Sequence, residues 1–198
     1  MIQLGMDFYQ QTDVVALARQ LIGKVLVTRF DGKVTSCRIA ETEAYNGIVD
    51  KASHAYGGRR SNRTKVMYMP GGTAYVYQCY GIHHLFNVVT NLMDEPHAIL
   101  IRSAEVLDGM DEILTRLGKT ILPQNLMKGP GVVSKGLGIF THHTASSLLD
   151  GNIALYDDGY KTDDSKIIAT PRIGVDYAAE DALLPYRFID TRFKQLRK

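Results

Sequence analysis

The sequence KVLVTRFDGKVTSCRIAETEAY, residues 24–45, determines the fold that we expect of this chain. It contains Asp31-Gly32, a turn dipeptide that commonly joins two antiparallel strands. The segments on either side, Lys24 to Arg29 and Val34 to Ala44, have the residue types of β-strands. We therefore predict a β-hairpin here.

The segments around this hairpin alternate between helical and extended patterns. Upstream, Thr12 precedes apolar residues at helical spacing and Gly23 ends the pattern, which predicts a helix capped by Thr12. Further strands are predicted at residues 74–80, 86–91, 97–105, 151–156 and 166–175, and short helices at 108–117 and 132–137. This mixture predicts an α+β protein.

Composition limits the possible classes of protein. A chain of 198 residues with 45% hydrophobic content can form one sizeable core, so we expect a single compact domain over residues 1–198. The formal net charge is only +2, so any surface that binds a polyanion has to be local. Cys37 and Cys79 lack disulfide-framework or metal spacing, residues 1–10 lack the features of a secretory signal, and no apolar run approaches about 18 residues. We expect a cytoplasmic protein without a membrane span.

A pair of carboxylates lies near the end of the predicted hairpin. Along a strand, Glu41, Glu43 and Tyr45 alternate with smaller residues and would share one face. Acidic residues are depleted from strand interiors, so the pair calls for an explanation. A role as base or metal ligand and a solvated face at the sheet edge are about equally favoured. Strand periodicity does not choose between Glu41 and Glu43.

Tyrosines are concentrated in the same part of the sequence. Six of the eleven fall between Glu41 and Asn87, and Tyr75 and Tyr77 would share a strand face. Tyr80 precedes Gly81, where a chain reversal would direct its ring outward. Rings of this kind can stack on an extruded base or wedge between base pairs, although any one tyrosine is also simply a good strand residue. The cluster therefore indicates a flat, aromatic substrate.

A basic loop supplies a local positive charge. Residues 57–65 read GGRRSNRTK, a flexible and hydroxyl-rich composition that contacts phosphates without reading sequence. We predict phosphate contacts from Arg59, Arg60, Arg63 and Lys65. Lys128-Gly129-Pro130-Gly131 before a short helix could present backbone N–H groups to a phosphate, but a plain tight turn is the favoured interpretation.

Metal and cofactor chemistry have weaker support. Adjacent histidines on a strand, as in His83-His84, point to opposite faces and do not easily share one ion. The sequence contains neither a P-loop nor a dinucleotide fingerprint nor a serine nucleophile elbow. We expect no metal and no cofactor, with water as the co-substrate.

Several of these motifs together resemble a known family. They are Glu41-Thr42-Glu43-Ala44-Tyr45, His54, Gly57-Gly58-Arg59, residues 67–73 around Pro70-Gly71-Gly72, Tyr75-Val76-Tyr77, Tyr80-Gly81, Asn87 and Leu100-Ile101-Arg102. In this combination the sequence resembles the alkyladenine DNA glycosylases, also called 3-methyladenine or N-methylpurine DNA glycosylases. The similarity extends from the first predicted helix to Tyr186-Arg187-Phe188.

The resemblance implies a fold and an activity. The fold is a single DNA glycosylase domain with a mainly antiparallel curved sheet, flanking helices and a protruding, DNA-intercalating β-hairpin. The activity is that of a monofunctional enzyme, which flips alkylated or deaminated purines out of duplex DNA and hydrolyses the N-glycosidic bond. Such an enzyme starts base excision repair. We expect a monomer whose partner is damaged double-stranded DNA and which, in a bacterium, is associated with the nucleoid.

The resemblance also assigns roles to individual residues. Glu43 matches the carboxylate that activates water, and Arg102 matches the arginine that helps to place it. Tyr80 matches the intercalating wedge. The residues that match the pocket for the flipped base are Tyr45, His54, Tyr77 and Asn87, of which Asn87 disfavours normal guanine.

The sequence departs from the family pattern in two places and leaves two other functions open. Ile82-His83-His84 follows the wedge where familiar members can carry other bulky residues, and the spacing between Asn87 and Arg102 is about two residues longer than in the mammalian pattern. The extra residues are expected in a turn at Asp94-Glu95-Pro96. The main alternative function is a non-catalytic damaged-DNA binding protein, and a weaker one is a histidine-metal hydrolase.

Overall fold

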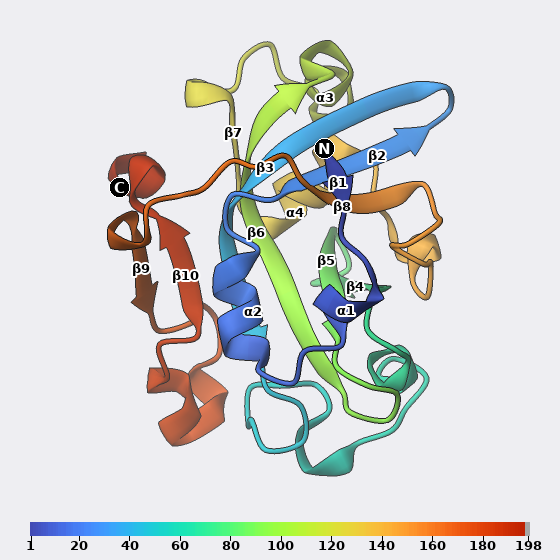
Figure 1. Cartoon of the computed structure of the whole chain (residues 1–198), viewed down its shortest axis with the longest axis vertical. Coiled ribbons are helices and arrows are strands. Elements are labelled where there is room, and N and C mark those ends of the chain that lie inside the picture. The colour runs from blue at the N-terminus through green and yellow to red at the C-terminus, as the bar shows by residue number, and fades with distance from the viewer. Residues whose placement is uncertain (197–198) are drawn as a thin grey trace.

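Two long antiparallel strands, β3 (Lys33–Tyr45) and β6 (His97–Asp108), run through the middle of the molecule (Figure 1). This computed structural model describes residues 1–196. All ten strands belong to one curled, antiparallel sheet, with helices on its surfaces. The protein is therefore an α+β fold, as predicted.

The other elements are short. The remaining strands are β1 (Ile2–Gln3), β2 (Val25–Phe30), β4 (Thr73–Cys79), β5 (His83–Thr90), β7 (Leu126–Lys128), β8 (Ile153–Asp157), β9 (Ile167–Thr170) and β10 (Arg187–Asp190). The α-helices are α1 (Met6–Tyr9), α2 (Val14–Gln20), α3 (Met110–Leu117) and α4 (Pro130–Leu137). The 3-10 turns are η1 (Tyr56–Gly58), η2 (Lys65–Tyr68), η3 (Pro123–Asn125), η4 (Thr141–His143), η5 (Asp164–Lys166), η6 (Asp176–Leu183) and η7 (Thr191–Leu196).

Both central strands change their outer neighbour halfway along. On the outer side of β3, pairing with β2 ends at Arg38 and pairing with β10 begins at Glu41. On the outer side of β6, pairing with β5 ends at Leu100 and pairing with β7 begins at Ser103. The β3–β6 register is irregular on both sides of Glu41, and such bulges re-aim side chains. The sheet therefore splays apart around its centre, which makes room for a site.

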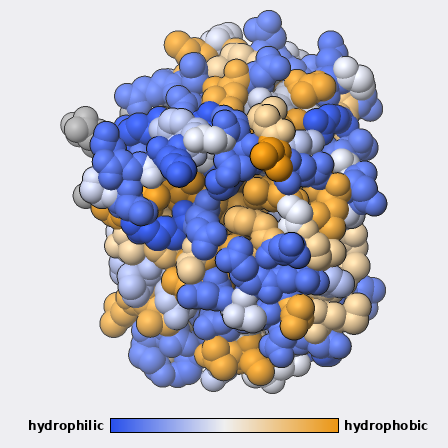
Figure 2. All heavy atoms as spheres, viewed as in Figure 1, coloured by the Kyte–Doolittle hydropathy of each residue, from blue (hydrophilic) through white to orange (hydrophobic). Residues whose placement is uncertain are grey.

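The core lies where the sheet meets α2 and the α3–α4 pair. Fully buried Leu17 of α2 belongs to the same apolar cluster as Ile39 of β3 and Ile101 of β6. In Figure 1, α2 crosses in front of the sheet, whereas the segment between β3 and β4 lies at the bottom of the view. Figure 2 shows hydrophilic and hydrophobic residues interspersed over this same face. The burial of this helix face fixes one side of the sheet and leaves the opposite side of the central strands for the site.

The predicted helices occur where they were expected, but they begin at other residues. The N-cap of α2 is Asp13 and not Thr12, because Asp13 Oδ1 accepts hydrogen bonds from the N–H groups of Val15 and Ala16 at 3.0 and 2.9 Å. A helix was expected from residue 108, but Asp108 ends β6 and α3 begins only at Met110. The later helix begins earlier than predicted, because proline at the first helical position of α4 is compatible with a helix start.

The predicted strands also occur where they were expected, but several have other bounds. The β2–β3 hairpin is confirmed, with positive φ angles of 52° at Asp31 and 71° at Gly32. The strand expected at 166–175 is wrong in its second half, because β9 ends at Thr170 and Pro171 has no N–H for a ladder. The strand expected at 151–156 occurs at Ile153–Asp157, and β7 and β10 were not predicted. Asp94-Glu95-Pro96 lies in the β5–β6 connection, as expected.

Candidate active site

Glu43 is the central polar side chain where the sheet splays. It is fully buried and lies in the run of buried residues 39–44 on β3. Its Oε2 accepts hydrogen bonds from the Tyr45 hydroxyl at 2.9 Å and from Arg102 at 3.2 Å, while Oε1 accepts from the backbone N–H of Ile173 at 2.8 Å. A buried carboxylate is thus fixed from three directions.

Arg102 joins the two carboxylates of the pair. Its guanidinium contacts Glu41 Oε1 at 3.3 Å as well as Glu43, and Glu41 also accepts from the Ser103 hydroxyl at 3.1 Å. Arg187 of β10 lies 3.3 Å from the same Glu41 oxygen. Glu41 and Glu43 therefore do share one region, but Glu41 is held between two arginines whereas Glu43 contacts Tyr45 and Ile173, which line the cavity described below. The solvated edge face considered from sequence is wrong for both.

Burial and charge act in opposite directions on Glu43. Burial raises the pKa of Glu43, and Arg102, the Ile173 N–H and the Tyr45 hydroxyl act to lower that pKa without fully offsetting burial. Burial acts to lower the pKa of Arg102, but Glu43 and Glu41 outweigh it and raise that pKa. Glu43 therefore holds its proton more tightly than an ordinary glutamate does.

An open cavity of about 400 Å³ adjoins this cluster. Its walls come from β3, β4, β5, β6, the β3–β4 connection and the segment after β9. Cavities of roughly 300–1,000 Å³ with mainly apolar walls and a few polar groups are typical of small-molecule sites. The residues that carry its side-chain chemistry are Tyr45, His54, Arg63, Tyr75, Tyr77, Asn87, Arg102 and Tyr177.

Aromatic rings form one wall of the cavity. Tyr75 and Tyr77 lie on the same face of β4 with ring centroids 5.4 Å apart, as the alternation predicted. His54 packs edge-on against Tyr77 at 4.8 Å, and its Nδ1 is 2.9 Å from the Tyr75 hydroxyl. Burial, Arg63 and Arg59 lower the pKa of His54 to about 4. His54 is therefore neutral at physiological pH.

Asn87 lies on β5 beside this wall and is almost fully buried. Its side-chain amide nitrogen donates to the carbonyl oxygens of Tyr75 at 3.1 Å and Leu85 at 3.2 Å. These two bonds fix the orientation of the amide plane. The structure thus brings Tyr45, His54, Tyr77 and Asn87 together around one cavity with Arg102.

Tyr80 lies at the tip of the β4–β5 hairpin. It is 91% exposed and has a positive φ of 52°, a conformation that is strained for a tyrosine. Gln78 donates to the Gly81 carbonyl oxygen at 2.7 Å and stabilises the tip, and Ile82 is also exposed. Tyr80 also lines the mouth of the cavity. Its ring is directed outward, as expected from its place before Gly81.

The four cations of the 57–65 loop are not equivalent. Arg60 lies over the Tyr68 ring at 3.8 Å and pairs with Asp94 at 2.7 Å. Arg63 instead lies over Tyr77 at 4.6 Å, donates toward His54 Nε2 at 3.1 Å, and lines the cavity. The side chains of Arg59 and Lys65 are exposed. The loop therefore divides into outward-facing cations and one arginine at the cavity.

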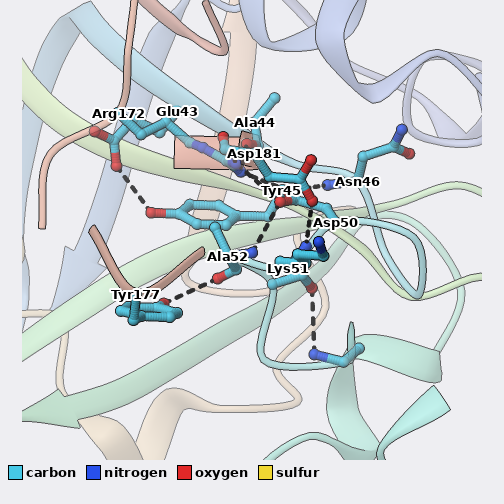
Figure 3. A network of polar contacts seen from close by, with 12 residues as sticks. Glu43, Ala44, Tyr45, Asn46, Asp50, Lys51, Ala52, Arg172, Tyr177 and Asp181 are labelled. Carbon is cyan, nitrogen blue, oxygen red and sulfur yellow. Dashed lines mark hydrogen bonds and ion pairs between the residues drawn. The ribbon is translucent and has the colours of Figure 1, made fainter. Parts of the chain in front are cut away.

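Several contributors to the site were not found from sequence. The backbone N–H of Ile173 carries no side-chain signal, and the segment that contains it was predicted to be a strand. Arg172 and Asp50 form a buried ion pair next to Tyr45, and Tyr177 donates its hydroxyl to the Ala52 carbonyl oxygen at 3.1 Å (Figure 3). The arginine beside a proline and glycine at residues 171–174 is the one signal that could have indicated an ordered loop.

The described residues contain neither a cluster that could hold a metal ion nor a helix that could span a membrane. Within residues 1–196, no group of three or more histidine, cysteine, aspartate or glutamate side chains has an arrangement that could hold a metal ion. His83 and His84 follow one another on β5, and His142 and His143 lie in η4. No helix in the described part of the chain has the length and apolar character needed to cross a membrane.

A buried carboxylate whose partners line an open aromatic cavity suits a hydrolase that acts on a flat substrate. The family model for methylpurine-DNA glycosylase (MPG) matches residues 7–193 of this chain. A protein of Chlamydia felis named "Putative 3-methyladenine DNA glycosylase" is 45% identical over 184 residues, which are 92% of this chain and 93% of that protein. A Bacillus thuringiensis protein of the same name is 40% identical over 195 residues, covering 94% and 95% of the two chains.

The chain belongs to the methylpurine-DNA glycosylase family. It is therefore a DNA glycosylase, a hydrolase of N-glycosyl bonds whose substrate is damaged DNA.

Proposed function

We propose that this glycosylase flips alkylated or deaminated purines out of duplex DNA and hydrolyses their N-glycosidic bond with water, without cleaving the strand. The observation that carries the proposal is that buried Glu43 is hydrogen-bonded to Tyr45, Arg102 and Ile173, all of which line an aromatic cavity of about 400 Å³. A base inside a duplex is out of reach of such a group, so the nucleotide has to leave the stack.

Glu43 has one acceptor position left for the attacking water. An ionised carboxylate offers about four lone-pair positions, and Tyr45, Arg102 and Ile173 use one each. Water held at the remaining position gives its proton to Glu43 as it attacks the sugar carbon. The developing oxocarbenium charge on the sugar is stabilised by the same carboxylate. Arg102 keeps Glu43 oriented through its contact with Oε2.

The cavity walls select a flat base. Tyr45 and Tyr77 offer ring faces, and a base alkylated at N3 or N7 is cationic and stacks on such rings through cation-π attraction. Neutral His54 adds a further wall without the repulsion that an imidazolium would exert on a cationic base. Asn87, held by two backbone carbonyls, disfavours normal guanine in this proposal. A cationic lesion also leaves easily, so part of the selectivity resides in the lesion itself.

DNA contacts outside the cavity complete the proposal. Tyr80 enters the space that the flipped nucleotide vacates and compensates for the lost stacking. Arg59, Arg60 and Lys65 contact phosphates, which positions the duplex without reading its sequence. Arg63 was grouped with them in the sequence-based prediction, but its contacts with Tyr77 and His54 favour a place at the cavity mouth.

The test is release of free base from a duplex with one defined lesion, with alkyladenine, ethenoadenine and hypoxanthine examined separately. We expect wild-type release and, for Glu43→Gln, a loss of about 10²- to 10⁴-fold in single-turnover rate with lesion binding retained. Gln has nearly the same shape as Glu, so binding serves as the control for folding. Undiminished excision by Glu43→Gln would refute Glu43 as the base.

The second candidate, a non-catalytic binder of damaged DNA, needs the rings and cations but no carboxylate. The exposed ring of Tyr80 and the outward-facing cations are the observations that suit it. Lesion-specific binding by wild-type protein with every lesion left intact would favour this function.

A further inference from the structure

A buried ion pair lies directly behind the Glu43 site. The Arg172 side chain is fully buried and that of Asp50 almost fully, and the guanidinium meets both carboxylate oxygens, with one contact of 2.8 Å. Two-point contact of this kind fixes the plane of both groups. Asp50 itself accepts from the backbone N–H groups of Asn46 and Ala52 at 3.0 and 2.9 Å. The pair is thus anchored in the connection that follows β3.

Arg172 links three segments that surround Glu43. It donates to the Ala44 carbonyl oxygen at 2.9 Å, at the end of β3, and to the Asp181 carbonyl oxygen at 3.1 Å in η6. Its guanidinium lies 5.0 Å from the Tyr45 ring centroid. Figure 3 shows Arg172, Glu43, Tyr45 and Asp50 within this one network.

The next residue along the chain makes the critical contact. Ile173 donates its N–H to Glu43 Oε1 at 2.8 Å, although no strand pairing holds residues 171–175. Pro171 ends β9, and Gly174 has a positive φ of 74°, so the local backbone turns rather than continuing a ladder. The side chain of Arg172 therefore attaches this turn to the β3 end, beside the apolar packing of Val175 with Ala52 and Tyr45.

We propose that Arg172, through its ion pair with Asp50, is a positioning residue that holds the Ile173 N–H on Glu43 and so sets the orientation of the base. This inference rests on the proposed role of Glu43. Arg172 does not line the cavity, so it acts through Ile173 and Tyr45 and not by contact with substrate. Loss of the N–H donor removes an interaction that favours the ionised carboxylate.

The first variant is Arg172→Lys, because it keeps the positive charge but cannot form the two-point contact. We expect the single-turnover excision rate at neutral pH to fall about tenfold and the acidic limb of the pH–rate profile to move to higher pH, with lesion affinity unchanged. An unchanged profile midpoint would overturn the proposal. If Arg172→Met moves the limb and Arg172→Lys does not, Arg172 acts through charge alone, which also overturns it.

A double variant controls for the charge that a single substitution would leave buried. Arg172→Met alone leaves Asp50 without its partner, whereas Arg172→Met with Asp50→Asn removes both charges. The proposal requires the double variant to show the same displaced limb. A double variant with the wild-type profile would mean that unpaired Asp50, and not loss of position, caused the change, and the proposal would fail.

The chain offers a matched control pair, Arg38 and Asp158, and Arg38 lies on β3, the strand that also carries Glu43. Arg38 makes a two-point contact with Asp158, donates to a backbone carbonyl, and lies 4.1 Å from the Tyr160 ring centroid, away from the cavity. Arg38→Lys changes the same kind of contact, and we expect it to leave the pH–rate profile in place. A limb displaced equally by Arg38→Lys would show a general loss of rigidity and overturn the proposal.

A measurement without turnover separates this inference from the proposed function. The pKa of the Glu43 carboxyl group, followed by carbon NMR, should be higher in Arg172→Lys than in wild type and unchanged in Arg38→Lys. If wild-type protein excises no lesion but this pKa rises, Arg172 still positions Glu43 and only the proposed function fails. An unchanged pKa in an active enzyme overturns the positioning role alone.

Discussion

Glu43 occupies a position where stability and activity oppose one another. Burial raises its pKa in the folded protein, so the folded state holds the Glu43 proton more tightly than the unfolded chain does. The stability that this provides is complete below the unfolded pKa and is lost as the pH rises through the folded pKa. Ionised Glu43, the form needed by a base, is therefore maintained at a cost in free energy of unfolding.

Glu43→Gln should reveal this cost, because glutamine has no proton to lose. We expect the melting temperature of the variant minus that of wild type to increase with pH. The increase should fall between the pKa of Glu43 in the unfolded chain and its pKa in the folded protein. Thermal unfolding over a pH series is the measurement. Glu180→Gln is the control with the opposite trend, because Lys51 lowers the pKa of Glu180. A difference that stays constant or shrinks with pH would contradict the burial argument.

His54 should titrate far below an ordinary histidine. Its pKa is lowered from 6.5 to about 4, so its stabilising contribution is present above 6.5 and is lost as the pH falls through about 4. Proton NMR of the imidazole should show this midpoint in wild type. In Arg63→Gln the midpoint should move upward, because one of the neighbouring positive charges is gone. A His54 midpoint near 6.5 in wild type would exclude the buried, cation-flanked geometry.

At the scale of elements, the β4–β5 hairpin carries strain at its tip. A non-glycine residue with positive φ destabilises the folded state by roughly 1–2 kcal/mol. Glycine avoids this strain, but it lowers the free energy of unfolding by about 0.4–1 kcal/mol because it gives the unfolded chain more conformational entropy. Tyr80 at φ 52° buries little surface that would compensate. Packing within the folded chain therefore does not account for this conformation, whereas the proposed insertion of the ring into DNA does.

Tyr80→Gly should raise the free energy of unfolding by about 0.5–1 kcal/mol, the difference between these two costs. It should also reduce excision more for a well-stacked lesion than for one at an already disrupted site. Urea unfolding and single-turnover excision are the two measurements, and Tyr80→Phe, which keeps the ring and the strain, is the control. Equal losses on both lesions would argue against the wedge.

Elements with a local signal were predictable, and those with only a tertiary cause were not. The β2–β3 hairpin follows from the turn residues Asp31-Gly32, and the early helix follows from its apolar periodicity. Strands β7 and β10 are short and exist because exposed edges of β6 and β3 are available to pair with them. Likewise, Tyr75, Tyr77 and Tyr80 could be placed by alternation and turn position. The Ile173 N–H could not, because the identity of a side chain does not reveal where its backbone donor points.

At the scale of the whole molecule, the positive charge that could attract DNA lies in a local group of cations and not in the net charge. A net charge of +2 provides little long-range attraction for DNA, so phosphate affinity depends on a few exposed cations. The sequence alone predicted the carboxylates, the rings and the cations within one stretch of the chain. It did not separate Arg63, which faces the cavity, from Arg59 and Lys65, because the loop conformation decides that.

Salt dependence should reveal this division. Replacement of both Arg59 and Lys65 by glutamine should reduce the slope of log affinity against log salt by about 0.9 for each phosphate that the protein no longer neutralises. The weakening should be the same on all duplex sequences. Arg63→Gln should leave the slope almost unchanged and alter excision instead. An unchanged slope in the first variant would place the phosphate contacts on another surface.

The pairing of β10 with β3 has a consequence for the life of the protein before it is complete. Residues 41–43 emerge from the ribosome well before their neighbours at 173 and 187–189 are synthesised. A nascent or truncated chain that lacks them holds Glu43 without its backbone donor and without the strand beside it. Such a chain would carry its rings and cations without an assembled Glu43 site, so under the proposed mechanism it would not remove bases from DNA until residues 173 and 187–189 had joined the fold.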